Sequence, residues 1–239
     1  MIDISPNSKG NRFRRKRMDL LTGLIRGVLV RRGACRILDL GGTGTFWRTW
    51  RDLIDWRRVD VTCLNLPGCG AGPDGPVNMH SGDARNLPEF SDRSFDICFS
   101  NSVIEHVGLW SDMKAMAAEV RRLAPAYMIQ TPNYWFPIEP HARTPFLHWL
   151  PEPLACRVVM ARKCGFWSKA DTVDAALSTL QSARLLDARQ MAALFPDSIV
   201  KRERFFGLTK SLIAIRDPSL RSPRAAAAEH PIARQGIAA

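Results

Sequence analysis

The sequence lacks a paired-cysteine motif, a long apolar run and a secretory leader, and each absence excludes a class of protein. Its six cysteines are scattered over 239 residues without a CxxC pair, and three lie inside apolar runs, where a thiol behaves as a small hydrophobe. We therefore expect buried free thiols in a reducing compartment. No stretch approaches the roughly 18 consecutive apolar residues of a membrane span, and no apolar leader with a small-residue cleavage site opens the chain. These absences favour a cytoplasmic protein.

Basic charge is distributed unevenly along the chain. The formal net charge is +11 and the sequence pI is near 10.0. Residues 1–36 carry ten Lys and Arg against two Asp, with the densest run at 11–17. Such a run is interpreted as a solvated leader, as a contact with anionic lipid headgroups at the inner face of the membrane, or as a contact with RNA phosphates. Nucleic acid is the least favoured partner, because no basic stripe interleaved with aromatic residues continues through the chain.

Short apolar runs alternate with helix-length segments through most of the chain. Helical spacing of apolar residues predicts helices over 18–30, 46–56, 111–123 and 187–195. Strand-like runs are found at 36–40, 59–66, 77–81, 95–100, 126–131, 199–206 and 210–216. Such alternation predicts an α/β fold, a Rossmann-like and mostly parallel seven-stranded sheet with helices on both faces. Only three residues separate the last two runs, too few for a parallel crossover, so the seventh strand is predicted to be antiparallel.

These patterns divide the chain into three parts. Residues 1–35 are predicted to form a basic arm and a helix, and residues 36–216 the α/β domain. Within it, prolines and aromatic residues break the pattern over 134–186, which predicts a small cap insertion of short helices on the substrate side. Residues 217–239 have few large apolar side chains and no periodicity, so we expect a disordered tail.

An acidic residue ends the first predicted strand and is followed at once by a glycine-rich turn, in the segment ILDLGGTGTF. A nicotinamide-dinucleotide fingerprint fits this segment poorly. Asp39 would repel the pyrophosphate, and the bulky Trp47 stands where the fingerprint needs its third small residue. The segment instead resembles the acidic-residue and glycine loop of the class I S-adenosylmethionine-dependent methyltransferases. Residues 81–107 (SGDARNLPEFSDRSFDICFSNSVIEHV) are similar to the second half of the cofactor site in their small-molecule "type 11" group. The matching stretch covers roughly residues 36–133.

The resemblance implies S-adenosyl-L-methionine as the cofactor and assigns roles to single residues. It implies that Asp39 holds the methionine end, that Asp83 accepts from the adenine amino group, and that Asn101 lies near the sulfonium. The family's ribose-binding acidic residue is replaced by Asn65, which loses charge-assisted hydrogen bonding, so we expect weaker cofactor binding. The full set of expected cofactor-binding residues is Asp39, Gly41, Gly42, Gly44, Asn65, Asp83, Ala84 and Asn101.

Candidate catalytic residues follow from the chemistry of methyl transfer. Displacement at a sulfonium needs mainly positioning of the nucleophile, and a base helps when the acceptor is a hydroxyl. We expect His141, and after it His106, to accept the proton. Binding-type side chains after the fifth strand, Asn133, Tyr134 and Glu139, are expected to contact the substrate. No known zinc-motif spacing is met, so no metal site is predicted.

The sequence therefore predicts a methyltransferase acting on a small or medium acceptor, such as a sugar, a lipid-linked glycan precursor or another secondary metabolite. Two alternatives stay open. An RNA methyltransferase is favoured if the basic arm binds phosphates in a salt-sensitive way. A non-catalytic scaffold with the methyltransferase fold is favoured if the protein binds no cofactor, because Thr43, Thr45 and Asn65 depart from the family pattern.

Overall fold

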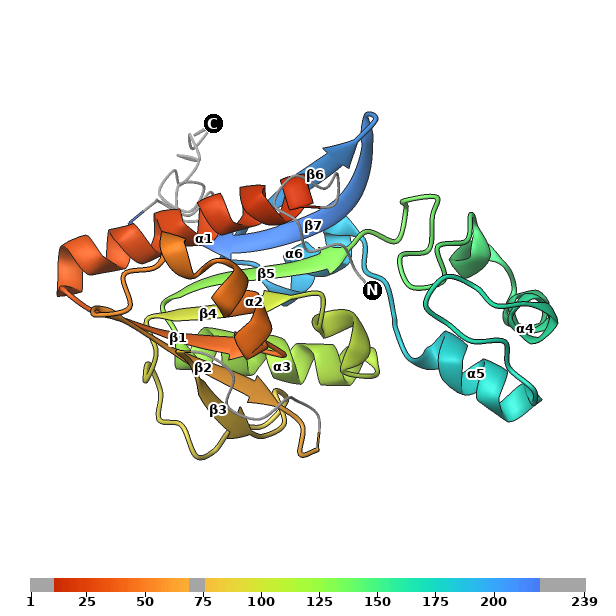
Figure 1. The fold of residues 1–239 in the computed structure, drawn as a ribbon, viewed down its shortest axis with the longest axis horizontal. Helices are drawn as coiled ribbons and strands as arrows, with labels where there is room; N and C mark the ends of the chain where they lie inside the picture. Colours follow the sequence, from red (N-terminus) through yellow and green to blue (C-terminus); the bar gives the residue numbers. More distant parts are fainter. Residues whose placement is uncertain (1–10, 69–75, 220–239) are drawn as a thin grey trace, which may run out of the picture.

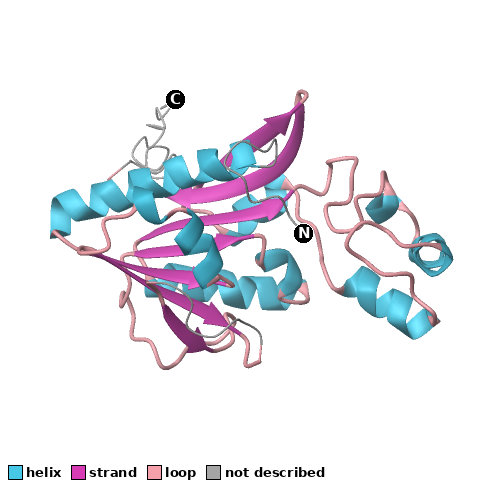
Figure 2. Ribbon diagram, in the orientation of Figure 1, coloured by secondary structure: helices cyan, strands magenta, loops and turns pink. Residues whose placement is uncertain are grey.

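Seven strands form one sheet in the order β3-β2-β1-β4-β5-β7-β6 (Figures 1 and 2). The computed structural model describes residues 11–68 and 76–219. The strands are β1 (Cys35–Leu40), β2 (Val59–Asn65), β3 (Asn78–Ser81), β4 (Ile97–Asn101), β5 (Ala126–Pro132), β6 (Ile199–Phe205) and β7 (Leu208–Arg216). Strands β1 to β5 pair in parallel, whereas β7 runs antiparallel to both β5 and β6. The predicted fold class and its single reversal are confirmed.

Helices cover both faces of this sheet (Figure 1). Helices α1 (Asn11–Arg32) and α2 (Gly44–Thr49) share one apolar cluster with the sheet, and α3 (Trp110–Leu123) and α6 (Ala188–Leu194) share the other. Successive side chains of a strand point to opposite faces. Accordingly, Ile37 of β1 belongs to the first cluster and Leu38 to the second. The result is a three-layer molecule with its cores on the two sides of the central strands.

The first helix begins earlier than the sequence pattern predicts. The expected span is 18–30, but α1 extends over Asn11–Arg32 and ends before Gly33, which has a φ of 77°. The basic run at 11–17 is therefore not an arm; it forms about two helical turns. Phe13 is half-buried and Met18 fully buried, so the stripe that continues through Leu21 and Leu24 starts inside the charged run.

The second predicted helix is shorter than expected. Instead of 46–56, α2 covers Gly44–Thr49 and is followed by the 3-10 turn η1 (Arg51–Leu53). The Thr43 side chain caps α2 by accepting a hydrogen bond from the backbone N–H of Phe46 at 3.2 Å. A threonine in the place of a family glycine is thus explained by helix capping, a role that suits its hydroxyl.

The insertion after β5 has its own small core beside the sheet (Figure 1). It contains η3 (Leu147–Trp149), α4 (Glu152–Ala161) and α5 (Val173–Gln181), as short helices were predicted there. Its return segment is tied back to the sheet, since the backbone N–H of Arg184 donates to the carbonyl of Glu105 at 2.6 Å. Glu105 lies in the turn η2 (Ile104–His106) after β4, so the cap stands at the carboxyl edge of the sheet. The tail predicted to be disordered falls, from residue 220 onward, outside the described residues.

The cysteines of the described segments are all free and buried: Cys35, Cys63, Cys98, Cys156 and Cys164. This matches the expectation from their apolar sequence context, while Cys69 lies outside the described residues. Before β4, the buried Asp96 accepts hydrogen bonds from the backbone N–H of Arg36 at 2.7 Å and from Arg32 at 2.6 Å. Asp96 therefore joins the end of α1 to two strands.

Candidate active site

Three cavities open at the carboxyl edge of the sheet and around the cap. The glycine-loop cavity, about 330 Å³, lies at the ends of β1, β2 and β3. The helix-end cavity, about 520 Å³, lies between the start of α1, the end of β5 and the β6–β7 hairpin. The cap cavity, about 340 Å³, separates the cap from α3 and α6. Ligands of open α/β sheets bind at this edge.

The glycine loop after β1 requires two of its glycines for steric reasons. Gly41 has a φ of 78°, and a Cβ there would lie 2.4 Å from Cγ2 of Val103. A Cβ on Gly42 would lie 2.0 Å from Oδ2 of Asp39. Gly44 is the buried first residue of α2. The loop therefore keeps its backbone close to the Asp39 carboxyl and to the turn after β4.

Asp39 is a buried carboxyl with a single side-chain donor. It is 2% exposed, and its Oδ2 accepts from the indole N–H of Trp47 at 2.7 Å. Burial raises the pKa of Asp39 to about 7, against the lowering effect of the Trp47 hydrogen bond. A neighbouring cation would favour the charged form of such a carboxyl. Sequence reasoning assigned no role to Trp47, whose only signal was its place one turn into the helix that follows the loop.

The predicted ribose and adenine residues line the glycine-loop cavity, and both already have protein partners. The Asn65 amide donates to the carbonyl of Gly42 at 2.8 Å, so it holds the loop from the β2 side. Asp83 accepts from the Arg85 guanidinium at 2.6 Å and from the Arg85 backbone N–H at 2.9 Å. These contacts lower the pKa of Asp83. Ala84 follows in the same cavity wall.

Asn101 lies in a different environment from the other expected cofactor residues. Its Oδ1 accepts from Arg17 of α1 at 2.7 Å, and Gln130 accepts from the same guanidinium nitrogen at 2.9 Å. Arg17 also forms a two-pronged ion pair with Glu203 of β6, with a shortest distance of 2.6 Å. This cluster of Arg17, Asn101, Gln130 and Glu203, here called the Arg17 network, is adjacent to the helix-end cavity, which Arg17 and Gln130 line. Sequence reasoning missed Arg17 and Glu203.

The helix-end cavity combines aromatic and basic side chains with two expected substrate residues. Asn133 is buried and donates to the carbonyl of Thr209 at 2.8 Å, and Glu139 is buried beside it. Lys210 lies 4.6 Å from the ring centroid of Phe13, and burial lowers its pKa. The other large or basic lining residues are Arg14, Arg17, Phe136, Arg143, Phe166 and Phe205.

The two candidate proton acceptors lie together between cavities. Their rings have centroids 4.8 Å apart; His141 lines the helix-end cavity and His106 the glycine-loop cavity. Nδ1 of His141 is 2.8 Å from Oε1 of Glu139, and this hydrogen bond raises the pKa of His141. Nδ1 of His106 is 2.8 Å from the carbonyl of Ser182, while burial lowers the pKa of His106.

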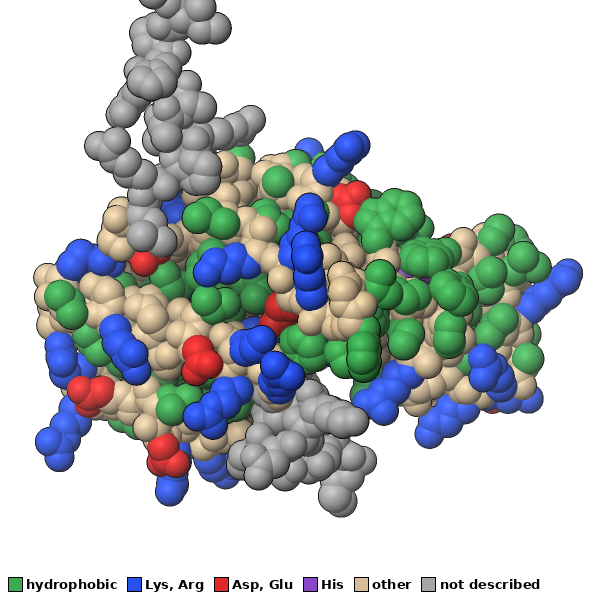
Figure 3. Space-filling view, turned by 90° about the horizontal axis from the view of Figure 1, so that it is seen from above, with side chains coloured by type: hydrophobic (Ala, Val, Ile, Leu, Met, Phe, Trp, Pro, Cys, Tyr) green, Lys and Arg blue, Asp and Glu red, His purple; other side chains and the backbone are tan. Residues whose placement is uncertain are grey.

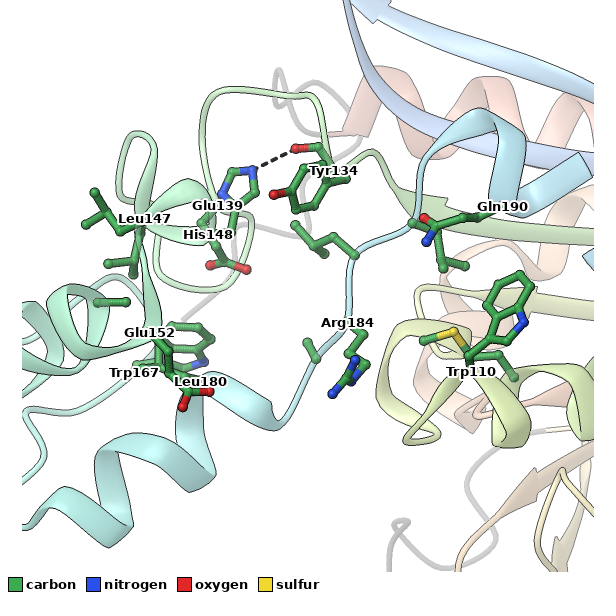
Figure 4. Close-up of a pocket in the computed structure, with 16 residues that line it drawn as sticks. Trp110, Tyr134, Glu139, Leu147, His148, Glu152, Trp167, Leu180, Arg184 and Gln190 are labelled. Carbon is green, nitrogen blue, oxygen red and sulfur yellow. Dashed lines mark hydrogen bonds between the residues drawn. The ribbon is translucent and has the colours of Figure 1, made fainter. Parts of the chain in front are cut away.

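The third expected substrate residue, Tyr134, lines the cap cavity instead (Figure 4). Figure 4 shows Tyr134, Glu139 and His148 on the cap side, facing Trp110 and Gln190 across the opening. His148 holds the chain here, because its Nε2 lies 2.8 Å from the carbonyl of Tyr134. Glu139 is thus shared by the cap cavity and the helix-end cavity.

Comparison with known proteins identifies the central segment. Residues 38–125 match the family model described as a methyltransferase domain. Two uncharacterized proteins of Mycobacterium tuberculosis, MT1557 and Rv1509, are each 36% identical over 72 residues, which is 30% of this chain and 24% of theirs. The chain thus matches about a quarter of the length of these relatives.

Solved structures with a similar fold include the PH0226 protein from Pyrococcus horikoshii OT3, with 15% identity and a TM-score of 0.49 over 90% of this chain and 93% of that one. The N-terminal domain of EvdMO1, crystallised with SAH and D-fucose, has 16% identity and a TM-score of 0.48. The match covers 84% of this chain and 81% of that one. An O-methyltransferase family protein from Burkholderia thailandensis has 16% identity and a TM-score of 0.47. The match covers 86% of this chain and 57% of that one.

The sheet order and the acidic glycine loop define a Rossmann-like methyltransferase fold. Within it, the match of residues 38–125 to the methyltransferase domain model confirms the resemblance to class I S-adenosylmethionine-dependent methyltransferases. The matched segment holds every expected cofactor residue, from Asp39 to Asn101. Members of this family use S-adenosylmethionine.

Proposed function

We propose that the chain is an S-adenosyl-L-methionine-dependent methyltransferase whose acceptor is a sugar, a lipid-linked glycan precursor or another small or medium metabolite. The single observation that carries this proposal is the meeting of two cavities at one histidine pair. The glycine-loop cavity is lined by Gly41, Asn65, Asp83 and Ala84 of the expected cofactor residues, and the helix-end cavity bears binding-type side chains. His106 and His141 lie between the two cavities with ring centroids 4.8 Å apart.

The proposed cofactor contacts use residues that line the glycine-loop cavity and also the buried Asp39, which is not one of its lining residues. The cationic amino group of the cofactor's methionine end would offset the buried charge of Asp39, for which Trp47 is the one side-chain donor within residues 11–68 and 76–219. Asp83 and Ala84 would meet the adenine and Asn65 the ribose. We now propose that Asn101 positions Arg17 rather than contacting the cofactor, because its Oδ1 is used in that hydrogen bond.

The proposed chemistry uses the Glu139–His141 pair. The cofactor supplies an electrophilic methyl group, and the protein orients the acceptor, excludes water and takes up a proton. A hydroxyl in the helix-end cavity would lose its proton to Nε2 of His141 while its oxygen bonds to the methyl carbon and the S–CH3 bond breaks. Glu139 holds Nδ1 at 2.8 Å and stabilises the imidazolium that results, as a carboxylate partner of a general base does.

The lining of the helix-end cavity favours an amphiphilic acceptor. Phenylalanine rings offer apolar contact area, while Arg14, Lys210 and Arg143 offer positive charge for a phosphate or carboxylate. A volume of about 520 Å³ is within the usual range of small-ligand sites, about 300–1,000 Å³.

The proposed partner surface is an anionic membrane. No helix in the described segments is long and apolar enough to cross a bilayer. Figure 3 shows hydrophobic side chains gathered over the cap end and basic ones over α1. Among the apolar residues of the cap, Trp135 is 63%, Phe146 51% and Phe166 56% exposed. Such a combination suits headgroup contact. Cosedimentation with phosphatidylglycerol vesicles, lost in a Trp135→Ala/Phe146→Ala variant, would support it, and equal cosedimentation of the variant would contradict it.

The first experiment is a calorimetric titration with S-adenosylhomocysteine. We expect micromolar binding by the intact chain, loss in Asp39→Ala and marked weakening in Asp83→Ala. Asp52→Ala is the matched control, because this carboxyl is 90% exposed. Absence of both heat and thermal stabilisation in the intact chain would favour the non-catalytic scaffold.

Activity is tested by transfer of a labelled methyl group to a panel of sugars, lipid-linked glycans and RNA. With an acceptor in hand, His141→Ala should lower kcat by about 10²–10⁴-fold, the usual contribution of a general base. The affinity of the His141→Ala variant for S-adenosylhomocysteine should equal that of the intact chain. Labelling of RNA alone, with steep salt dependence, would replace the small-molecule proposal by the RNA alternative.

A further inference from the structure

Three potential metal-ligating side chains converge at the junction of the two cavities. One ligand atom each from Glu105, His106 and His141 lies within 4.8 Å of the other two. This is the one group of three found in the described part of the chain. Two of these residues are adjacent in η2, and the third comes from the cap, so the cluster exists only in the folded molecule.

The carboxyl of Glu105 has an unexplained oxygen. The residue is 1% exposed, its Oε2 accepts from the Thr131 hydroxyl at 2.9 Å, and its Oε1 is buried without a hydrogen-bond partner among the described residues. A buried carboxylate oxygen with no donor costs free energy unless something occupies the position in front of it. Burial accordingly raises the pKa of Glu105 to about 7.

Both imidazoles are held in place by a hydrogen bond at Nδ1. Nδ1 of His141 lies 2.8 Å from Oε1 of Glu139, and Nδ1 of His106 lies 2.8 Å from the carbonyl of Ser182. An acceptor at Nδ1 places the proton there and leaves the lone pair on Nε2. Histidines that bind metal ions are fixed in this way, by a carboxylate or a backbone carbonyl at the second nitrogen.

We propose that Glu105, His106 and His141 bind a divalent transition-metal ion such as Zn²⁺. Two imidazoles and one carboxylate are a known catalytic donor set for Zn²⁺, and such sites keep a fourth position open. Bond lengths of about 2.1 Å in a tetrahedral site hold the ligand atoms about 3.4 Å apart. The three side chains, now within 4.8 Å, would close onto the ion.

The role of the ion rests on the proposed function, although its binding does not. The open position would face the helix-end cavity, which His141 lines. The ion takes the lone pair of His141 that would otherwise accept the proton. An acceptor hydroxyl bound to the ion becomes more acidic and loses its proton to solvent, and its oxygen then attacks the methyl group. Coordination and proton transfer to His141 are thus alternative ways to activate the same hydroxyl.

The test is a titration of the purified, chelator-treated full chain with Zn²⁺ alone, followed by Co²⁺ as a spectroscopic probe. We expect one high-affinity ion per chain and visible Co²⁺ bands without a thiolate charge-transfer band, since no cysteine belongs to the cluster. Glu105→Gln, His106→Ala and His141→Ala should each weaken binding by more than tenfold. Glu139→Gln, which leaves all three ligands in place, should weaken it by about 10–100-fold.

His80→Ala is the matched control, since His80 lies on β3 and pairs with Glu89 at 3.1 Å, away from the cluster. Unchanged Zn²⁺ affinity in both His106→Ala and His141→Ala, with circular dichroism showing folded chains, would overturn the proposal. So would a thiolate band in the Co²⁺ spectrum. Where a variant fails to fold, the isosteric Glu105→Gln supplies the same comparison.

Titration with S-adenosylhomocysteine on the same samples separates this inference from the proposed function. Zn²⁺ binding without S-adenosylhomocysteine binding supports the metal site and contradicts the methyltransferase. The converse result overturns only the metal site.

Discussion

The glycine-loop cavity and the helix-end cavity share one edge of the sheet, but they are assembled in different ways. The first takes its lining residues from strand ends and turns within 41–107. The contact that holds the carboxyl beside its glycine loop, Asp39 with Trp47, spans eight positions. The second joins the start of α1, the end of β5, the cap and the β6–β7 hairpin, and its central ion pair, Arg17 with Glu203, spans 186 positions. If the proposed function holds, a cofactor site built from one local unit can be retained while the acceptor site changes around it.

Gly42→Ala should abolish cofactor binding at the glycine-loop cavity and leave the helix-end cavity unchanged. Its Cβ would lie 2.0 Å from Asp39 Oδ2, and the buried carboxyl would have to move. We expect S-adenosylhomocysteine binding to fall below detection in calorimetry. Gly23→Ala is the control, because no atom lies within 4 Å of its Cβ position. Normal binding by Gly42→Ala would mean that the loop adapts and that our account of this glycine is wrong.

Arg17→Ala should disrupt the packing around the helix-end cavity and leave cofactor binding at the glycine-loop cavity unchanged. It removes the guanidinium from the half-buried Glu203 and Asn101 and from the buried Gln130, and leaves Ser211 as a donor to Glu203 and Ser102 as a donor to Gln130. Loss of one partner of a buried ion pair costs about 3–5 kcal/mol of stability, and we expect the lower end because the pair is at the edge of the sheet. Urea unfolding measures this, with Arg15→Ala, exposed on the same helix, as control. If Arg17→Ala also abolished S-adenosylhomocysteine binding, the two halves would not be separable.

Asp39 and Glu105 are buried carboxyls with raised pKa values, and the pH dependence of stability should reveal both. The pKa values of Asp39 and Glu105 are about 7, whereas carboxyls of an unfolded chain titrate near pH 4. The folded state binds these protons more tightly, so the free energy of unfolding falls as pH rises from about 4 to 7. Asp39→Asn and Glu105→Gln should each be more stable than the parent at pH 8, by about 2–4 kcal/mol, without a gain at pH 4. Urea unfolding at both pH values, with chelator present, checks this; identical pH slopes for parent and variants would refute it.

Arg85→Ala should produce the mildest change. Arg85 occupies both oxygens of Asp83 in an ion pair that is 41% and 37% exposed. An exposed pair of this kind contributes about 0–1 kcal/mol. Its removal frees the carboxylate for a ligand, so S-adenosylhomocysteine affinity should rise by a few fold or stay level. A large loss of affinity would show instead that Arg85 itself contacts the cofactor.

The difference between the two halves also decides what the sequence could predict. Asp39, Gly41 and Gly42 are neighbours in a motif, so a reader of the sequence can place them together, and the antiparallel seventh strand follows from a three-residue turn. Arg17 was assigned to a solvated or lipid-binding arm because no local pattern distinguishes an arginine that pairs with Glu203 from one that faces water.

The histidines illustrate the same limit. His141, His106 and Glu139 were each selected from the sequence, but only the fold shows that His141 contacts both of the others. A search for zinc-motif spacings does not find the Glu105, His106 and His141 cluster, because tertiary structure brings these side chains together. Helix α1 was predicted too short since charge at 11–17 hid the stripe that Phe13 and Met18 begin.

The antiparallel β7 brings a protein-engineering opportunity. Because β7 runs antiparallel to β5, Lys210 and Ser211 near its start lie at the edge where β5 ends, and Ser211 pairs with Pro132. The connecting turn is only Phe206 and Gly207, at φ of 48° and 80°, with Phe206 91% exposed. A longer segment grafted into this turn would hang over the helix-end cavity and would leave both apolar clusters untouched. New acceptor preferences should therefore be sought first by varying the length and composition of that hairpin.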